Sequence, residues 1–245
     1  MPRFFVCREA IDKDSRTVRI EGDDARHIAR SLRMAVGDEV TVCDGSSVEY
    51  QCTLTRIRDE ECELEIISEG LSAREPRFEI ILCMAYPKAD KLETVIQKAV
   101  ELGATRIIPF ESKRCIKRPK AEKLEKLTMR HQRIAEEAAK QCGRASVPEV
   151  TAPLGFSAML TEALKAPLAL LCYEGEDMRS LKEALPEDPP SAISVIIGAE
   201  GGFDLDEAGA ARDAGAVSVS LGKRILRCET APSFVLSAIS FKYEL

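Results

Sequence analysis

The sequence has no tryptophan and only two histidines, His27 and His131, among its 245 residues. The histidines lie far apart in the chain, so the several clustered ligands of a zinc hydrolase are hard to assemble. The nine cysteines are scattered, and no two of them form a Cys-x-x-Cys pair. This argues against a zinc ribbon or a disulfide framework. We therefore expect no metal, and we expect the cysteines to be reduced, buried, small side chains.

Long apolar runs are also missing. No segment is apolar enough to cross a bilayer, and residues 1–5 do not look like a cleavable signal, so we expect a cytoplasmic protein without a membrane partner. Two nucleotide-binding signatures are absent as well. There is neither Gly-x-Gly-x-x-Gly after the first strand nor Gly-Lys-Ser/Thr, which argues against a dinucleotide site and a phosphate-binding loop.

An excess of positive charge is lacking too, since the formal net charge is −6. The average alone argues against a nucleic-acid partner. However, basic residues are concentrated between residues 113 and 133, and Arg26, Arg30 and Arg33 recur at helical spacing near the N-terminus. Local positive charge attracts a polyanion more effectively than the total suggests. A solvated helix face remains the alternative for each basic stretch.

The chain divides near residue 72. Before that point, short segments alternate apolar and polar residues, which is typical of half-buried strands. They are residues 4–7, 16–20, 39–43, 48–57 and 62–67. A short helix over residues 25–34, capped by Asp23 or Asp24, interrupts them. The pattern predicts a small barrel or β-rich module, followed by a linker over residues 70–76.

Strands and helices alternate beyond the linker. We predict strands at residues 77–85, 105–110, 166–173, 192–198 and 216–220, and helices at 88–102 and 121–142. Asp204 and Glu207 form a capping box for a further helix, and Thr230 starts the last one. Such alternation predicts a mainly parallel sheet with helices on both faces.

Two glycine-bearing segments, residues 197–203 and 221–231, each follow a predicted strand and precede a predicted helix. The carboxyl edge of an open α/β sheet is where small molecules bind, and glycine lets a ligand approach the backbone. Glu200 would repel a phosphate and suits a cation or a neutral polar ligand. S-adenosylmethionine, which carries a sulfonium charge and no phosphate, fits this description. Plain tight turns remain the alternative.

Several motifs now resemble one family. Ile-Gly-Ala-Glu-Gly-Gly-Phe at 197–203, Leu-Gly-Lys-Arg-Ile-Leu-Arg at 221–227 and Glu-Thr-Ala at 229–231 resemble the RsmE-type 16S ribosomal RNA uridine-N3 methyltransferases of the SPOUT superfamily. Residues 1–5, 27, 32–34, 36–40 and 44–45 look like that family's N-terminal barrel, and residues 98–103, 112–114 and 141–144 look like its catalytic domain. Two departures are Ala199, where the family usually has proline, and Cys228, where threonine is common.

The resemblance implies an α/β protein with an N-terminal PUA-like RNA-binding β-barrel, residues 1–72, followed by an α/β SPOUT methyltransferase domain, residues 73–245. That domain would end in a C-terminal deep trefoil knot. It implies S-adenosylmethionine as cofactor and 16S ribosomal RNA, within the small ribosomal subunit, as partner. It also implies a homodimer, for which we expect the apolar face of the last helix, Val235, Leu236 and Ile239, to form the interface.

The expected site residues fall into three groups: a cofactor pocket carried over by motif, catalytic residues that the chemistry of methyl transfer to uridine N3 requires, and RNA contacts inferred from charge. The cofactor pocket would comprise Leu171, Cys172, Tyr173, Ile197, Gly198, Ala199, Glu200, Gly201, Leu221, Gly222, Ile225 and Leu226. Catalysis would involve Arg227, which holds negative charge on a uracil oxygen, Glu229, which orients Arg227 or accepts a proton through water, and Arg144, which enters from the partner subunit. RNA contacts would come from Arg3, His27, Arg30, Arg33, Arg114, Lys117 and Arg118.

Three functions stay open. The first is the uridine-N3 methyltransferase. The second is a related knotted enzyme that methylates a ribose 2′-hydroxyl or another base with the same cofactor. The third is a non-catalytic RNA-binding or assembly protein that retains the scaffold, against which the presence of both Arg227 and Glu229 argues.

Overall fold

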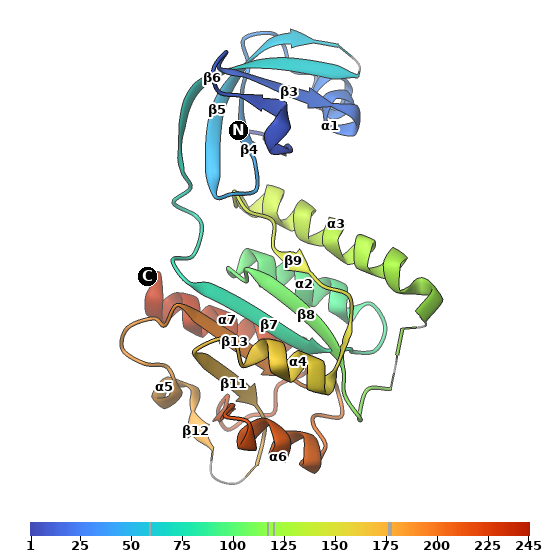
Figure 1. The fold of residues 1–245 in the computed structure, drawn as a ribbon, viewed down its shortest axis with the longest axis vertical. Helices are drawn as coiled ribbons and strands as arrows, with labels where there is room; N and C mark the ends of the chain where they lie inside the picture. Colours follow the sequence, from blue (N-terminus) through green and yellow to red (C-terminus); the bar gives the residue numbers. More distant parts are fainter. Residues whose placement is uncertain (59, 117, 120, 176–177) are drawn as a thin grey trace. The chain divides into compact units, whose positions relative to one another are not determined.

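The computed structural model describes residues 1–58, 60–116, 118–119, 121–175 and 178–245 (Figure 1). It divides into two compact units, Met1–Glu75 with Ala139–Val147, and Pro76–Ala138 with Pro148–Leu245. Sequence patterns did not indicate that residues 139–147 group with the N-terminal ones. In the described part of the chain, no helix is long and apolar enough to cross a membrane.

The first unit contains a six-stranded sheet in the order β1-β4-β5-β6-β3-β2. Its strands are β1 Arg3–Phe5, β2 Ile11–Asp12, β3 Thr17–Glu21, β4 Glu39–Cys43, β5 Val48–Ile57 and β6 Glu61–Leu71. β1 pairs parallel with β4, and the other pairs are antiparallel. Alternation along the strands places Val42, Tyr50 and Leu64 in one buried core. The five strands predicted from the sequence are confirmed.

The helical part of this unit differs from the prediction. A short 3-10 helix, η1, spans Arg8–Ala10, and α1, Gly22–Arg26, runs directly into the π-helix η2, His27–Ser31. The N-cap is Glu21, which makes no side-chain cap. The prediction that Asp23 or Asp24 caps the helix is therefore wrong. Both lie inside the first turn, where a carboxylate still interacts favourably with the helix dipole.

The second unit contains an all-parallel sheet in the order β10-β8-β7-β13-β11-β14-β12, with β9 pairing to β8. The strands are β7 Glu79–Ala85, β8 Arg106–Glu111, β9 Glu149–Val150, β10 Leu154–Gly155, β11 Leu168–Cys172, β12 Arg179–Ser180, β13 Ala192–Ile197 and β14 Val217–Ser220. All residues of β13 are buried, as expected for a central strand covered on both faces.

Helices cover both faces of this sheet, which confirms the α/β architecture. The helices after β7 are α2 Lys91–Glu101, η3 Ala121–Lys123, α3 Leu124–Cys142, α4 Phe156–Ala163, α5 Leu181–Ala184, α6 Leu205–Asp213 and α7 Thr230–Tyr243. α4 lies over one face, and α2 and α7 pack together over the other (Figure 1). The predicted capping box of Asp204 and Glu207 at α6 is present. α4, α5 and the two-residue strands are not among the elements predicted from the sequence.

The last helix also requires a correction. Val235, Leu236 and Ile239, the residues expected to form a subunit interface, are fully buried within the chain itself. They face inward because α7 packs against α2 and β13. The large apolar side chains that α7 exposes are Phe234 and Phe241, which are 44% and 74% exposed.

Candidate active site

Three neighbouring strands of the second unit end side by side. Cys172, the last residue of β11, pairs with Ile197 of β13 on one side and with Val219 of β14 on the other. Since the three strands are parallel, the segments that follow them leave the sheet at the same edge. Both glycine-bearing segments singled out in the sequence are therefore brought together here.

The segment after β13 is a tight turn that leaves no room for a side chain at Gly198. The Gly202 amide donates to the Ala199 carbonyl oxygen at 2.9 Å, and Gly202 has a φ of +65°. A Cβ atom on Gly198 would lie 3.0 Å from the Gly202 carbonyl carbon. Glycine at 198 and 202 is therefore required by close approach and by backbone conformation, respectively.

An aromatic cluster anchors this turn to the sheet. Phe203 is 2% exposed, and its ring stacks on that of Phe110 with centroids 6.3 Å apart. The rings of Phe156 and Tyr173 pack edge-on against Phe203 at 6.4 Å. The glycine turn is thus fixed at its far end by packing, while its backbone remains exposed to a ligand.

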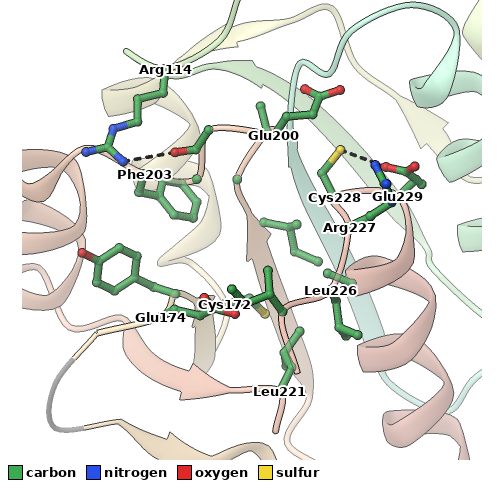
Figure 2. A pocket seen from close by; sticks show the side chains of 18 of the residues that line it. Arg114, Cys172, Glu174, Glu200, Phe203, Leu221, Leu226, Arg227, Cys228 and Glu229 are labelled. Atoms are coloured by element: carbon green, nitrogen blue, oxygen red, sulfur yellow. Dashed lines mark hydrogen bonds between the residues drawn. The ribbon is translucent and has the colours of Figure 1, made fainter. Parts of the chain in front are cut away.

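The three segments enclose a cavity of about 510 Å³, a size suited to a small-molecule ligand. Figure 2 shows side chains from all three segments pointing into it. It is lined by Lys91, Arg114, Cys172, Tyr173, Glu174, Ile197, Gly198, Ala199, Glu200, Gly201, Gly202, Phe203, Val219, Leu221, Arg224, Ile225, Leu226, Arg227, Cys228, Glu229 and Ala231.

A lysine lies between the two acids on one wall of the cavity. The Lys91 ammonium is 3.2 Å from Oε1 of Glu200 and 3.1 Å from Oε2 of Glu229. The Glu229 oxygen also accepts a hydrogen bond from the Cys228 thiol at 3.2 Å. No sequence motif indicates Lys91, which is distant in the chain from both carboxylates.

Both acids are held in the charged form. Burial opposes the charge of Glu200, but its own amide, the Lys88 amide and the Lys91 ammonium outweigh burial and lower its pKa. The pKa of Glu229 is lowered by its own backbone amide, and further by Cys228 and Lys91. Burial raises the pKa of the Cys172 and Cys228 thiols to about 12, so neither is a nucleophile at neutral pH.

Two arginines of the cavity differ in their bonding. Arg114 donates from Nη1 to the Gly201 carbonyl oxygen at 3.1 Å (Figure 2), which ties the basic segment after β8 to the glycine turn. Arg227 is exposed, and its guanidinium makes no ion pair or hydrogen bond to any residue that the structure describes. Its backbone carbonyl accepts from Thr230 and Ala231, which sets the start of α7. Arg227 is thus available to an anionic group.

Most of the predicted cofactor residues line this cavity, whereas Leu171 and Gly222 do not. Leu171 is fully buried in β11, and Gly222 shapes the turn after β14 with a φ of +110°. The cavity also includes residues that sequence reasoning missed, among them Glu174 and Val219. Their position directly beside the predicted strand ends was a usable signal for both.

Arg144, predicted to be catalytic, lies in the first unit and does not line the cavity. Its side chain is 4% exposed and donates through Nε and Nη2 to Oε2 of Glu75, at 3.1 and 2.7 Å. The other Glu75 oxygen accepts from the amides of Ala145 and Ser146. These contacts within the first unit are structural, and the catalytic role of Arg144 stays a prediction.

The predicted RNA contacts fall into two kinds. His27, Arg30, Arg33, Arg114 and Arg118 are exposed, and Lys117 is outside the described residues. Arg3, by contrast, is 8% exposed and pairs with Glu49 at 3.1 Å. It also donates to the Cys43 sulfur. This guanidinium stabilises the first sheet and is not accessible to a polyanion.

An all-parallel sheet with a glycine-lined cavity at its carboxyl edge defines an α/β enzyme that binds a small molecule. Residues 74–240 match a family model described as an RNA methyltransferase domain, and residues 20–67 match an RNA methyltransferase PUA domain. Ribosomal RNA small subunit methyltransferase E of Bacillus subtilis is 32% identical to this chain, covering 100% of it and 98% of the relative. The chain belongs to the ribosomal RNA small subunit methyltransferase E family.

Other relatives agree with this assignment. The protein of the same name from a Synechocystis strain is 35% identical, covering 97% of this chain and 77% of its own. The crystal structure of one from Neisseria gonorrhoeae, bound to S-adenosyl methionine, has a TM-score of 0.86 and 30% identity, covering 99% and 98% of the two chains. A Legionella pneumophila methyltransferase with bound cofactor has a TM-score of 0.85 at 29% identity, covering 98% and 96%.

Proposed function

We propose that this chain transfers a methyl group from S-adenosylmethionine to N3 of one uridine in 16S ribosomal RNA. The observation that supports this most is the cavity itself, which is lined both by a glycine-rich turn and by Arg227, whose guanidinium has no partner among the described residues. Such a site can accept a nucleoside-like cofactor and an anionic reaction centre together.

The residues present fit this cofactor. The missing Cβ at Gly198 lets the turn close against Gly202, the backbone of this turn lines the cavity, and Ile197, Val219 and Leu226 supply apolar walls. The charged carboxylates of Glu200 and Glu229 complement a positive ligand. When bound, S-adenosylmethionine supplies an electrophilic methyl group on a sulfonium. Ala199 keeps the turn closed through its carbonyl, so the absence of the family's proline leaves the turn intact.

The uracil imide needs help from protein groups. Its N3 carries a proton at neutral pH, and the nitrogen becomes a good nucleophile only once that proton is lost. Arg227 would stabilise the negative charge that develops on a carbonyl oxygen of the base. Glu229 contacts Lys91 and Cys228 and has no ion pair with Arg227 in the described chain. Of its two candidate roles, accepting the proton through a water is therefore favoured over orienting Arg227.

RNA would be held first by charge. Exposed Arg30 and Arg33 of the first unit and Arg114 and Arg118 of the second are the candidates. The target base has to leave its stack to reach a methyl donor inside a cavity. We further propose a homodimer, a closed PUA-like barrel in the first unit and, because the substrate is ribosomal, a cytoplasmic location.

A knotted C-terminus is part of the same proposal. β14 lies beyond β11 in the sheet, yet the helix that follows it packs against α2 and β13 on the far side of β11. The chain must cross back over its own strands between β14 and α7. This return path supports a tucked chain end such as the trefoil knot of the family.

Small ribosomal subunits from a strain that lacks the modification provide the test. The purified chain would be incubated with them and methyl-deuterated S-adenosylmethionine, and the digested 16S RNA analysed by mass spectrometry. We expect labelled 3-methyluridine at one position. A labelled 2′-O-methyl nucleoside would instead establish the ribose alternative. Folded protein that produces no label, and no calorimetric heat with the cofactor, would indicate a non-catalytic protein.

A further inference from the structure

Lys91 joins two segments of the cavity that are otherwise separate. It is the first residue of α2, is 31% exposed, and contacts Glu200 from the glycine turn and Glu229 from the segment before α7. The segment just before this helix is linked to the turn a second time, because the Lys88 amide donates to both Glu200 oxygens at 3.2 and 3.3 Å. One ammonium thus connects the wall that would hold the cofactor with the wall that carries Arg227.

The charges explain why this connection matters. Two carboxylates within hydrogen-bonding distance of one nitrogen repel each other when the cation between them is removed. The side chains in contact with them are Lys91 from α2 and the Cys228 thiol, and Arg227, two residues before Glu229, lines the same cavity. Without Lys91, Arg227 is the cation closest to Glu229 along the chain. Glu229 would then take up a proton or turn towards that guanidinium, and either change alters the reaction centre.

We propose that Lys91 is a positioning residue that fixes the carboxylates of Glu200 and Glu229 and thereby keeps the Arg227 guanidinium available for the substrate. This inference rests on the methyltransferase function proposed above. Lys91 acts through the two acids and Arg227, and it is assigned no contact with the reacting atoms. The substitution that tests it is Lys91→Met, which keeps the aliphatic stem and removes the charge. Lys91→Gln is a second neutral variant in case the first does not fold.

Two control variants accompany Lys91→Met. Lys91→Arg retains a cation that can reach both acids. Lys165→Met removes a lysine from an ion pair elsewhere, because Lys165 pairs with Glu162, which keeps Arg106 as its other partner. Lys165 does not line the cavity, so its variant reports the cost of losing a surface lysine by itself.

The first readout does not depend on activity. In an NMR titration of ¹³C-labelled glutamate carboxyls, assigned with Glu200→Gln and Glu229→Gln, the pKa of both acids should rise in Lys91→Met. The expected rise is about one pH unit, at the low end for loss of a nearby opposite charge in partly exposed groups. Lys91→Arg and Lys165→Met should leave both titrations close to those of the wild type.

The second readout separates binding from turnover. In Lys91→Met, kcat should fall by about 10-fold or more through misplacement of the reaction centre, while the Kd of S-adenosylmethionine stays within about 3-fold. Lys91→Arg should recover most of the loss. If Lys91→Met titrates and turns over like Lys165→Met, or if Lys91→Arg is as impaired as Lys91→Met, the inference is wrong. If the wild-type protein transfers no methyl group, the proposed function is wrong. The NMR titration would still show whether Lys91 controls the pKa of Glu200 and Glu229.

Discussion

At the scale of single residues, the site depends on a side chain that is missing. Gly198 and Gly202 approach so closely that the turn between them has no room for a Cβ at 198. The neighbouring Glu200 and Arg227 can then face the same cavity from different segments. Backbone that a ligand can reach and charge held nearby are the two properties from which the function is inferred.

Gly198→Ala should weaken cofactor binding. The added methyl group would contact the Gly202 backbone at 3.0 Å, so the turn has to open, and overpacking of this kind costs about 1–3 kcal/mol. Calorimetry should show the Kd of S-adenosylmethionine rising about 10-fold or more. Gly209→Ala on α6 is the matched control, because no atom lies within 4 Å of its added Cβ. Equal affinities for the two variants would contradict the assigned role of the turn.

Arg227→Ala should affect turnover more than binding. Removing a donor that stabilises developing negative charge typically lowers kcat by about 100-fold or more. The Kd of the cofactor should hardly change, because Arg227 supports the substrate. Single-turnover methyl transfer and calorimetry separate the two quantities. Normal turnover by this variant would exclude Arg227 as the anion-stabilising group.

At the scale of elements, local patterns were sufficient for most strands and for the long helices. The apolar runs of β7, β11 and β13 and the capping box at α6 are signals of neighbouring residues, and these elements lie where the sequence placed them. The prediction for α7 was wrong, because its apolar stripe was expected to form the subunit interface. Burial against α2 explains that stripe, and the packing partner of a helix cannot be read from its own sequence.

The buried ion pair of Glu75 and Arg144 should stabilise the first unit. Both side chains are nearly buried, and Glu75 accepts four hydrogen bonds from Arg144, Ala145 and Ser146. Glu75→Gln removes the carboxylate charge that the buried Arg144 guanidinium contacts twice, so we expect a loss of about 3 kcal/mol in the free energy of unfolding.

Chemical denaturation measures this loss. The exposed pair of Arg133 and Glu137 on α3 provides the comparison, and Glu137→Gln should change the free energy of unfolding by less than about 0.5 kcal/mol. If Glu75→Gln is as stable as Glu137→Gln, the buried pair is not a stabilising contact.

At the scale of the whole molecule, the sequence order conceals which segments meet. In the sheet, β11 lies between β13 and β14, although it comes before both of them in the chain. The glycine segments that follow β13 and β14 therefore leave the sheet on either side of the end of β11. Lys91 joins the same site from a helix far earlier in the sequence. A resemblance to a family could supply the cofactor residues by motif, but a lysine between two distant acids has no local signal.

RNA binding should respond to charge at positions in both units. Arg33→Ala and Arg118→Ala should each weaken binding of 16S RNA and reduce the slope of log Kd against log salt concentration by about one. Both side chains are exposed. Lys182→Ala, an exposed lysine at α5, is the control that should leave the slope unchanged. If Arg33→Ala and Arg118→Ala both show the same slope as Lys182→Ala, neither arginine contacts the RNA.

The central claim is that the segments following β11, β13 and β14 hold the methyl donor beside Arg227. A crystal structure of the protein with S-adenosylmethionine tests it most directly. We predict electron density for the nucleoside against the Gly198–Gly202 turn, with its methyl group directed towards Arg227. Density for the ligand at any other place, with these three segments empty, would contradict the account.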